Sequence, residues 1–156
     1  MDPHVQKILE FLNEIGLTVV EREILDDTLL PGITAMDGAL VVDFGRLGYP
    51  GDLLHEAGHL AQLSEAERKR WSGDFTDAEG YELGAIAWSY AASVHLGLSV
   101  EVVFHKDGYK GDAEWLGEQF AAGSSIGVPM LEWKGMTSLS GIPTYPKMQS
   151  WLCSQE

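Results

Sequence analysis

Apolar residues recur at helical spacing in three stretches of the chain. In residues 3–15 an apolar side chain returns every three or four positions, with Pro3 at the start and Gly16 directly after the stretch. The same spacing occurs in residues 51–63 and in residues 77–96. Residues three or four apart lie on one face of a helix, so this periodicity predicts three helices.

Between the first two predicted helices the pattern becomes typical of strands. Residues 17–25, LTVVEREIL, are rich in β-branched side chains and predict one strand. Residues 28–44, TLLPGITAMDGALVVDF, predict two more strands around a turn at Asp37 and Gly38, because Asp-Gly between apolar runs favours a hairpin. Pro31 has no backbone N–H to donate, so we expect that its strand lies at an edge of the sheet or begins irregularly.

The last third of the chain is less regular. Residues 111–123 predict a helix, whereas residues 100–105 are ambiguous between strand and helix. Residues 127–136 and 145–153 predict short helical turns interrupted by prolines. No repeat, low-complexity tract or linker separates these segments, so we expect one α+β domain over residues 1–156.

The second predicted helix carries the sequence HEAGH, in which His55 and His59 are four residues apart. Side chains at this spacing lie one above the other, so both imidazoles can reach one ion at the ~2.0–2.1 Å that zinc requires. Glu56 is rotated by about 100° from His55, where its carboxylate can take a proton from a metal-activated water. The motif therefore predicts two metal ligands and a general base. The alternative is a histidine pair without a metal, but an exposed Gly58 would then cost about 1 kcal/mol relative to alanine for no gain.

This segment resembles the signature of the zincin metallopeptidases over about residues 41–93. The resemblance implies a helix bearing H-E-x-x-H, an edge strand above a cleft, a downstream residue that completes a zinc site, and a peptide or protein substrate. The metzincin branch would place glycine and histidine where this chain has Gln62 and Glu65. The gluzincin branch, which takes its third ligand from a glutamate on a later helix, is the better match.

Two glutamates of the third predicted helix are candidates for that ligand. Glu79 has the spacing of thermolysin-like enzymes, but it also fits a capping box, T-x-x-E, with Thr76. Glu82 lies further into the helix on a stripe of apolar and small residues, where a buried carboxylate needs a partner. We therefore favour Glu82 and keep Glu79 as the alternative, with Asp74 or Asp77 less favoured.

His105 and Tyr109 lie in a predicted turn after this helix. In gluzincins a histidine or tyrosine outside the metal shell donates a hydrogen bond to the developing oxyanion. The resemblance implies this catalytic role for His105 or Tyr109. An ordinary loop histidine is the alternative, because nothing in the spacing determines where His105 points.

Charge excludes some classes of partner. The chain has 24 acidic and 10 basic side chains, a net charge of −14, which repels nucleic acid and anionic membrane surfaces. The N-terminal residues lack a basic leader, and no stretch approaches the ~18 apolar residues that span a membrane, so we expect a soluble cytoplasmic protein. The single cysteine, Cys153, excludes a disulfide within one chain.

Two functional hypotheses follow. The first is a small zinc-dependent peptidase in which His55, His59 and Glu82 bind zinc and Glu56 is the general base. The alternative is a zinc-binding regulatory or interaction module that keeps the site without efficient turnover. The fourth coordination position separates the two, because catalytic zinc keeps it for water whereas structural zinc fills it with a protein ligand.

Overall fold

The computed structural model describes residues 1–75 and 79–155 and confirms the predicted α+β order. The strands are β1 (Val19–Glu21), β2 (Ile33–Met36) and β3 (Ala39–Val42). The helices are α1 (Pro3–Ile15), α2 (Gly51–Gln62), α3 (Glu65–Arg70), α4 (Glu79–Leu96), α5 (Val100–Val103), α6 (Ala113–Ala121) and α7 (Val128–Trp133), with a short 3-10 helix, η1 (Tyr109–Gly111), between α5 and α6. A helix and a small sheet are thus followed by a mainly helical part.

The three strands form one mixed sheet in the order β1-β3-β2. β2 and β3 are antiparallel, with Ile33 opposite Val42, whereas β1 runs parallel to β3. Asp37 and Gly38 form the predicted turn, and both have the positive φ (51° and 81°) that a two-residue hairpin turn favours. β2 lies at an edge of the sheet, as predicted.

The first strand is shorter than the pattern of residues 17–25 predicts. The Arg22 N–H still donates to the Val42 carbonyl at 3.0 Å. The Ile24 N–H then donates to the Asp43 carboxylate at 3.0 Å instead of to the neighbouring strand. The Asp43 side chain therefore takes the place of a backbone acceptor from the neighbouring strand, and β1 ends early.

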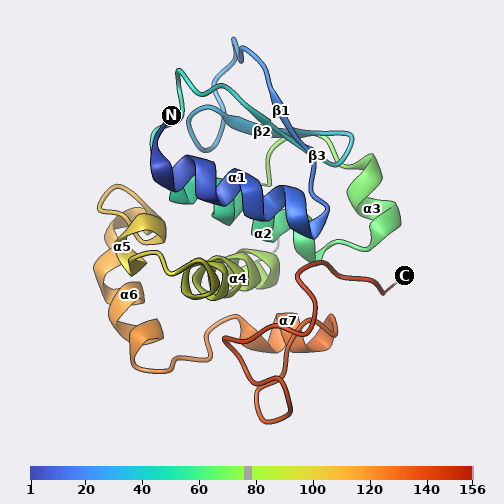
Figure 1. Cartoon of the computed structure of the whole chain (residues 1–156), viewed down its shortest axis with the longest axis vertical. Helices are drawn as coiled ribbons and strands as arrows, with labels where there is room; N and C mark the ends of the chain where they lie inside the picture. The colour runs from blue at the N-terminus through green and yellow to red at the C-terminus, as the bar shows by residue number, and fades with distance from the viewer. Residues whose placement is uncertain (76–78, 156) are drawn as a thin grey trace.

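Helix α2 lies at the centre of the molecule, in contact with α1, β2, α4 and α5 (Figure 1). All twelve of its residues are buried. A helix buried on every side usually carries apolar residues all round. This one instead carries five buried polar or charged side chains: Asp52, His55, Glu56, His59 and Gln62. Buried groups of this kind need partners inside the protein, and those partners define the site described below.

Glycines allow α2 and α4 to pack closely. A Cβ atom at Gly58 would lie 3.0 Å from the Ala85 carbonyl oxygen, and one at Gly84 would overlap Gln62 Oε1. Gln62 is fully buried, so it has little freedom to move aside. The small residues beside the two histidines therefore permit the helix spacing on which the site depends.

The C-terminal third combines short helices with irregular chain. Residues 100–105, ambiguous from sequence, contain the short helix α5. No helix forms over residues 145–153, where helical turns were predicted, because backbone groups there bond to other elements. Trp151 O accepts a hydrogen bond from Trp88 Nε1 at 2.9 Å, and the Cys153 N–H donates to Ala61 O at 2.8 Å. This segment thus runs along α4 to the end of α2.

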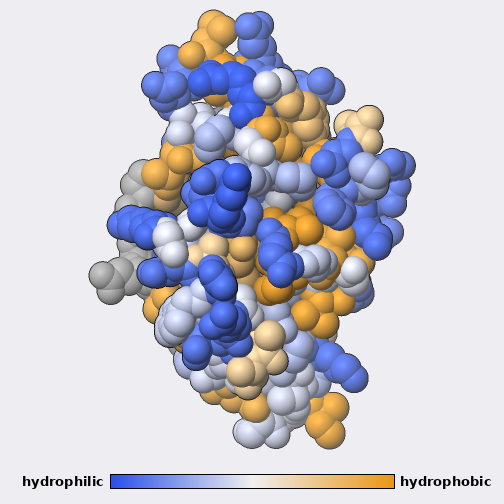
Figure 2. Space-filling view, turned by 90° about the vertical axis from the view of Figure 1, so that its left-hand side faces the viewer, coloured by the Kyte–Doolittle hydropathy of each residue, from blue (hydrophilic) through white to orange (hydrophobic). Residues whose placement is uncertain are grey.

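The surface on the side of α5 and α6 carries hydrophilic residues with apolar residues between them (Figure 2). Among the helices of the described residues, none is long and apolar enough to cross a membrane. Cys153 is buried and has a free thiol.

Candidate metal centre

Three side chains converge where α2 and α4 face each other. His55 Nε2 lies 3.0 Å from Glu82 Oε1, and His59 Nε2 lies 2.8 Å from Glu82 Oε2. One potential ligand atom from each of these residues lies within 4.8 Å of the others. We call His55, His59 and Glu82 the triad. It is a group that could hold a metal ion, built from one turn of α2 and the beginning of α4.

The triad is buried on its histidine side and open on its carboxylate side. The side chains of His55 and His59 are 10% and 2% exposed, whereas that of Glu82 is 44% exposed. Burial raises the pKa of Glu82, but hydrogen bonds and charge from the two imidazoles outweigh it and hold that pKa well below its ordinary value. Burial lowers the pKa of His55, but Glu82 outweighs it, so the pKa is raised. A cation at the centre would compete with protons for these same atoms.

Aromatic rings close one side of the triad. The ring of His59 stacks on Phe75, with centroids 4.7 Å apart and an angle of 11° between the planes. Phe75 in turn stacks on Trp71 at 4.7 Å. The His55 and His59 rings are 5.1 Å apart at 78° to each other, so both can direct Nε2 at the same carboxylate. The stack thus supports the ring plane of His59.

The donor set of the triad fits zinc. Two imidazole nitrogens and one glutamate oxygen are the ligands of a well-known class of catalytic zinc site. Tetrahedral bonds of 2.0–2.1 Å place neighbouring ligand atoms about 3.3 Å apart. The separations of 3.0 and 2.8 Å from the imidazole nitrogens to Glu82 require only small movements to reach that value. Among the described residues the group holds three donors, and a four-coordinate zinc ion would have one further position.

Glu56 lies beside the triad without being part of it. It is only 2% exposed, and burial raises its pKa to about 7. His55 opposes this rise electrostatically, and Glu82 adds to it, which places the carboxylate within the field of the triad. A carboxyl group with such a pKa exchanges protons near neutral pH. Its role as general base stays a prediction.

Of the other carboxylates considered as third ligands, Asp74 is the one that the structure describes, and it is not a member of the ligand group. Asp74 accepts two hydrogen bonds, of 2.9 and 2.8 Å, from the loop before β2 and from β2 itself. Asp77, the side chain of Glu79 and the predicted capping box with Thr76 lie outside the described residues. Among the described candidates, Glu82 is the carboxylate that meets both imidazoles.

His105 lies against the first turn of α2, with its ring directed at another partner. His105 Nε2 is 2.7 Å from Asp52 Oδ1, and both side chains are buried. The ring stacks on Tyr49 at 3.6 Å, and the Tyr49 hydroxyl donates to Asp107. Burial raises the pKa of Asp52 against the opposing effect of His105. We call Asp52 and His105 together the Asp52–His105 pair. The oxyanion role of His105 stays a prediction.

Tyr109 reaches the triad from the opposite edge of the His55 ring. Its hydroxyl oxygen is 3.2 Å from His55 Nδ1, and the two rings meet edge to face at 5.5 Å. The sequence offered Tyr109 only as the alternative to His105 for the oxyanion donor, and gave no sign that Tyr109 touches a ligand histidine. It also did not single out Asp52 as the partner of His105. A signal was available in the spacing, because Asp52 precedes His55 by about one turn and so lies on the face of the helix that carries the histidines.

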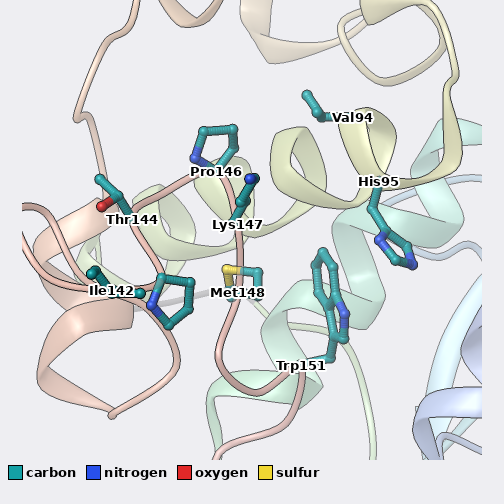
Figure 3. Close-up of a pocket in the computed structure, with 9 residues that line it drawn as sticks. Val94, His95, Ile142, Thr144, Pro146, Lys147, Met148 and Trp151 are labelled. Atoms are coloured by element: carbon teal, nitrogen blue, oxygen red, sulfur yellow. The ribbon is translucent and has the colours of Figure 1, made fainter.

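A separate apolar pocket of about 780 Å³ lies at the other end of α4. Figure 3 shows Val94 and His95 of α4 on one side of it and the C-terminal segment on the other. Val94 follows Glu82 by twelve residues, about 18 Å along the helix. No triad residue lines this pocket, so it is distinct from the metal centre.

The comparisons with known proteins assign no family. No protein-family model, no curated protein and no solved structure matches the chain. Function is therefore inferred from the residues of the site and their geometry.

Proposed function

We propose that the protein is a small zinc-dependent hydrolase of the zincin type that cleaves peptide bonds. The observation that carries the proposal is the approach of Glu82 to both histidines of HEAGH, at 3.0 and 2.8 Å. Burying parts of a carboxylate and two imidazoles costs hydration free energy. This cost is offset when the groups pair with one another or bind a metal. Together with H-E-x-x-H on one helix, this arrangement is similar to the gluzincin ligand set.

Each residue of the site has a distinct role in this reaction. Bound zinc would supply a Lewis acid that polarises the scissile carbonyl and lowers the pKa of a water molecule to ~7. His55 and His59, through Nε2, and the Glu82 carboxylate would hold the ion. The Glu56 carboxylate takes the proton of the attacking water and delivers it to the leaving amine nitrogen. Its pKa of about 7, raised by burial, supports both transfers because the group gains and loses a proton near neutrality.

Access to the triad supports an enzyme over a closed zinc module. The metal group comprises three donors among the described residues, and the Glu82 side chain is 44% exposed to solvent. His105, the fourth ligand that a closed site would use, has its Nε2 on Asp52 at 2.7 Å. The oxyanion donor proposed from the resemblance is His105 or Tyr109, whose present partners are Asp52 and His55 respectively.

The proposal is tested with Glu56→Gln. Protein purified without added metal should contain about one zinc per chain by elemental analysis, and E56Q should contain the same amount. Hydrolysis of a mixed fluorogenic peptide library should fall by about 100- to 10,000-fold, because an amide cannot accept the proton. Glu65→Gln, on the exposed surface of α3, makes the same chemical change away from the triad and should leave both quantities unaltered.

Two results would contradict the proposal. One is protein that stays free of zinc after incubation with the metal. The other is an E56Q variant that cleaves the library as fast as the parent, which would remove Glu56 from the mechanism even if zinc is bound.

A further inference from the structure

The walls of the apolar pocket at the C-terminal end of α4 are anchored to the rest of the protein. Lys147 O accepts a hydrogen bond from Thr137 Oγ1 at 2.8 Å, and the Lys147 N–H donates to Thr144 O at 3.0 Å. The carbonyl of Trp151 accepts from Trp88 Nε1 at 2.9 Å, and the two indole rings meet edge to face at 5.5 Å. The volume of about 780 Å³ is within the ~300–1,000 Å³ range of small-molecule sites, which are usually largely preformed in this way.

Most of the lining is apolar, and part of it is exposed to solvent. Ile142 is 99% exposed and Val94 is 48% exposed. In the view of Figure 3, Ile142 lies at one end of the pocket and Trp151 at the other, with Met148 between them. We call Ile142, Met148 and Trp151 the apolar row. A ligand lying along this row would remove apolar surface from water, which favours an extended apolar body.

Two side chains of the lining can donate hydrogen bonds to a ligand. Among the described residues, neither Lys147 Nζ nor a ring nitrogen of His95 has a hydrogen-bond or ion-pair partner. The hydroxyl of Thr144, a third polar residue of the lining, already donates to Gly141 O. No acidic side chain in the described part of the chain lines the pocket, although acidic side chains outnumber basic ones by 24 to 10. The lining therefore presents an ammonium group and an imidazole beside the apolar row.

We propose that this pocket binds a small carboxylate with an aliphatic body, such as a medium-chain fatty acid. The aliphatic chain lies along the apolar row, and the carboxylate accepts hydrogen bonds from Lys147 and His95. Interactions between exposed charges more than about 8 Å apart are largely screened at physiological ionic strength. An ammonium group in contact with the carboxylate therefore outweighs a net charge of −14 that is spread over the whole chain. The site is independent of the proposed zinc centre, because no triad residue lines it.

Other occupants fit this pocket less well. An extended peptide binds through main-chain hydrogen bonds to a strand edge, but no residue of β1, β2 or β3 lines the pocket. Pro143 and Pro146, which do line it, have no N–H to donate. An anionic membrane or a second copy of the chain would be repelled by the net charge of −14. A small molecule with a single negative group avoids most of that repulsion.

The experiment compares three probes by isothermal titration calorimetry, each below its micelle-forming concentration. Decanoate, decan-1-ol and decyltrimethylammonium share an apolar body and carry negative, neutral and positive head groups. Decanoate should bind at one site per chain and at least about fivefold more tightly than decan-1-ol, and the cation should bind most weakly. Non-specific attraction to a chain of net charge −14 predicts that the cation binds most tightly, so the order of the three affinities separates the two explanations.

Two variants test the two halves of the ligand, and each has a matched control. Lys147→Gln should weaken decanoate about three- to fivefold and leave decan-1-ol within about twofold of the parent. Its control, Lys106→Gln, removes an exposed lysine of the loop after α5 and should change neither affinity. Ile142→Ser should weaken both probes to a similar extent, by about fivefold. Its control, Leu25→Ser, replaces an apolar residue that is 83% exposed in the loop after β1. All four side chains are exposed, so the variants should fold as the parent does.

NMR of labelled methionine methyl groups locates the bound probe. Decanoate should shift the signal of Met148 more than those of Met36 on β2 and Met130 on α7. Equal affinity for decanoate and decan-1-ol, tighter binding of the cation, or larger shifts at Met36 or Met130 would overturn the proposal. Binding of the protein to phosphatidylglycerol vesicles, or a parent dimer that I142S dissociates, would also overturn it. Each of these results leaves the proposed function standing, because that proposal is tested by zinc content and by E56Q.

Discussion

Helix α2 takes part in two buried histidine–carboxylate clusters, and they differ in what they could bind. In the triad, two imidazoles of α2 share one carboxylate from α4, and that carboxylate is 44% exposed. In the Asp52–His105 pair, one carboxylate of α2 meets one imidazole, and the two side chains are only 8% and 10% exposed. His105 Nδ1 has no hydrogen-bond partner among the described residues.

The comparison shows that burial of a histidine beside a carboxylate does not by itself make a metal site. The Asp52–His105 pair brings one carboxylate to one imidazole nitrogen, so it offers a cation only two donor groups. The triad brings two imidazole nitrogens and the Glu82 carboxylate to one point, with a second carboxyl group, Glu56, beside it. The number of converging donors and the access of solvent therefore separate the two clusters.

The largest expected effect is on zinc binding. His59→Ala removes one of three ligands, so its zinc affinity should fall by roughly 1,000-fold or more. His105→Ala changes the other cluster and should keep about one zinc per folded chain. Chelator competition on the two variants measures the difference. Equal zinc loss in both would erase the distinction between the clusters.

The next effect is on folding stability. His105→Ala leaves the buried carboxylate of Asp52 without its partner and should lower the free energy of unfolding by about 3 kcal/mol. His4→Ala is the control, since His4 and Asp2 form an exposed pair at 3.8 Å whose loss should cost less than about 0.5 kcal/mol. Urea denaturation of the metal-free proteins gives both values. A loss below about 1 kcal/mol in H105A would show that the pair is not held as the contacts indicate.

The smallest effect concerns the pH dependence of stability. Burial raises the pKa of Asp52 above 3.8 in the folded protein, so the folded state holds this proton more tightly than the unfolded state. The stabilisation of the folded state by this proton is fully present below pH 3.8 and is lost as the pH rises through the pKa of Asp52 in the folded protein. Between the unfolded and folded pKa values of Asp52, the loss is about 1.4 kcal/mol for each pH unit. Asp52→Asn keeps an acceptor for His105 but does not titrate.

Urea midpoints measured from pH 4 to pH 7 test this prediction. The stability of the parent relative to D52N should decline across that range. A difference between the two proteins that does not change with pH would contradict the assigned direction of the Asp52 pKa.

The sequence was most informative where local rules decide the structure. The helix over residues 3–15, the hairpin turn at Asp37 and Gly38 and the helix that carries HEAGH follow from apolar spacing and turn chemistry, and all three are present. It was least informative where distant groups compete for the backbone. The strand over residues 17–25 ends early because Asp43 takes one of its N–H groups, and residues 145–153 form no helix.

By itself the sequence determined that His55 and His59 share one face of a helix, because a four-residue separation brings two side chains together in any α-helix. Only the tertiary structure decided which described carboxylate completes the group and which groups support it. The choice of carboxylate depends on the close approach of α4 to α2, which the contact between Gly58 and Ala85 permits. The support of His55 depends on a loop that brings Tyr109 to it from fifty-four residues away. Such distances are set by the packing of the whole chain, so they cannot be predicted from a local sequence pattern.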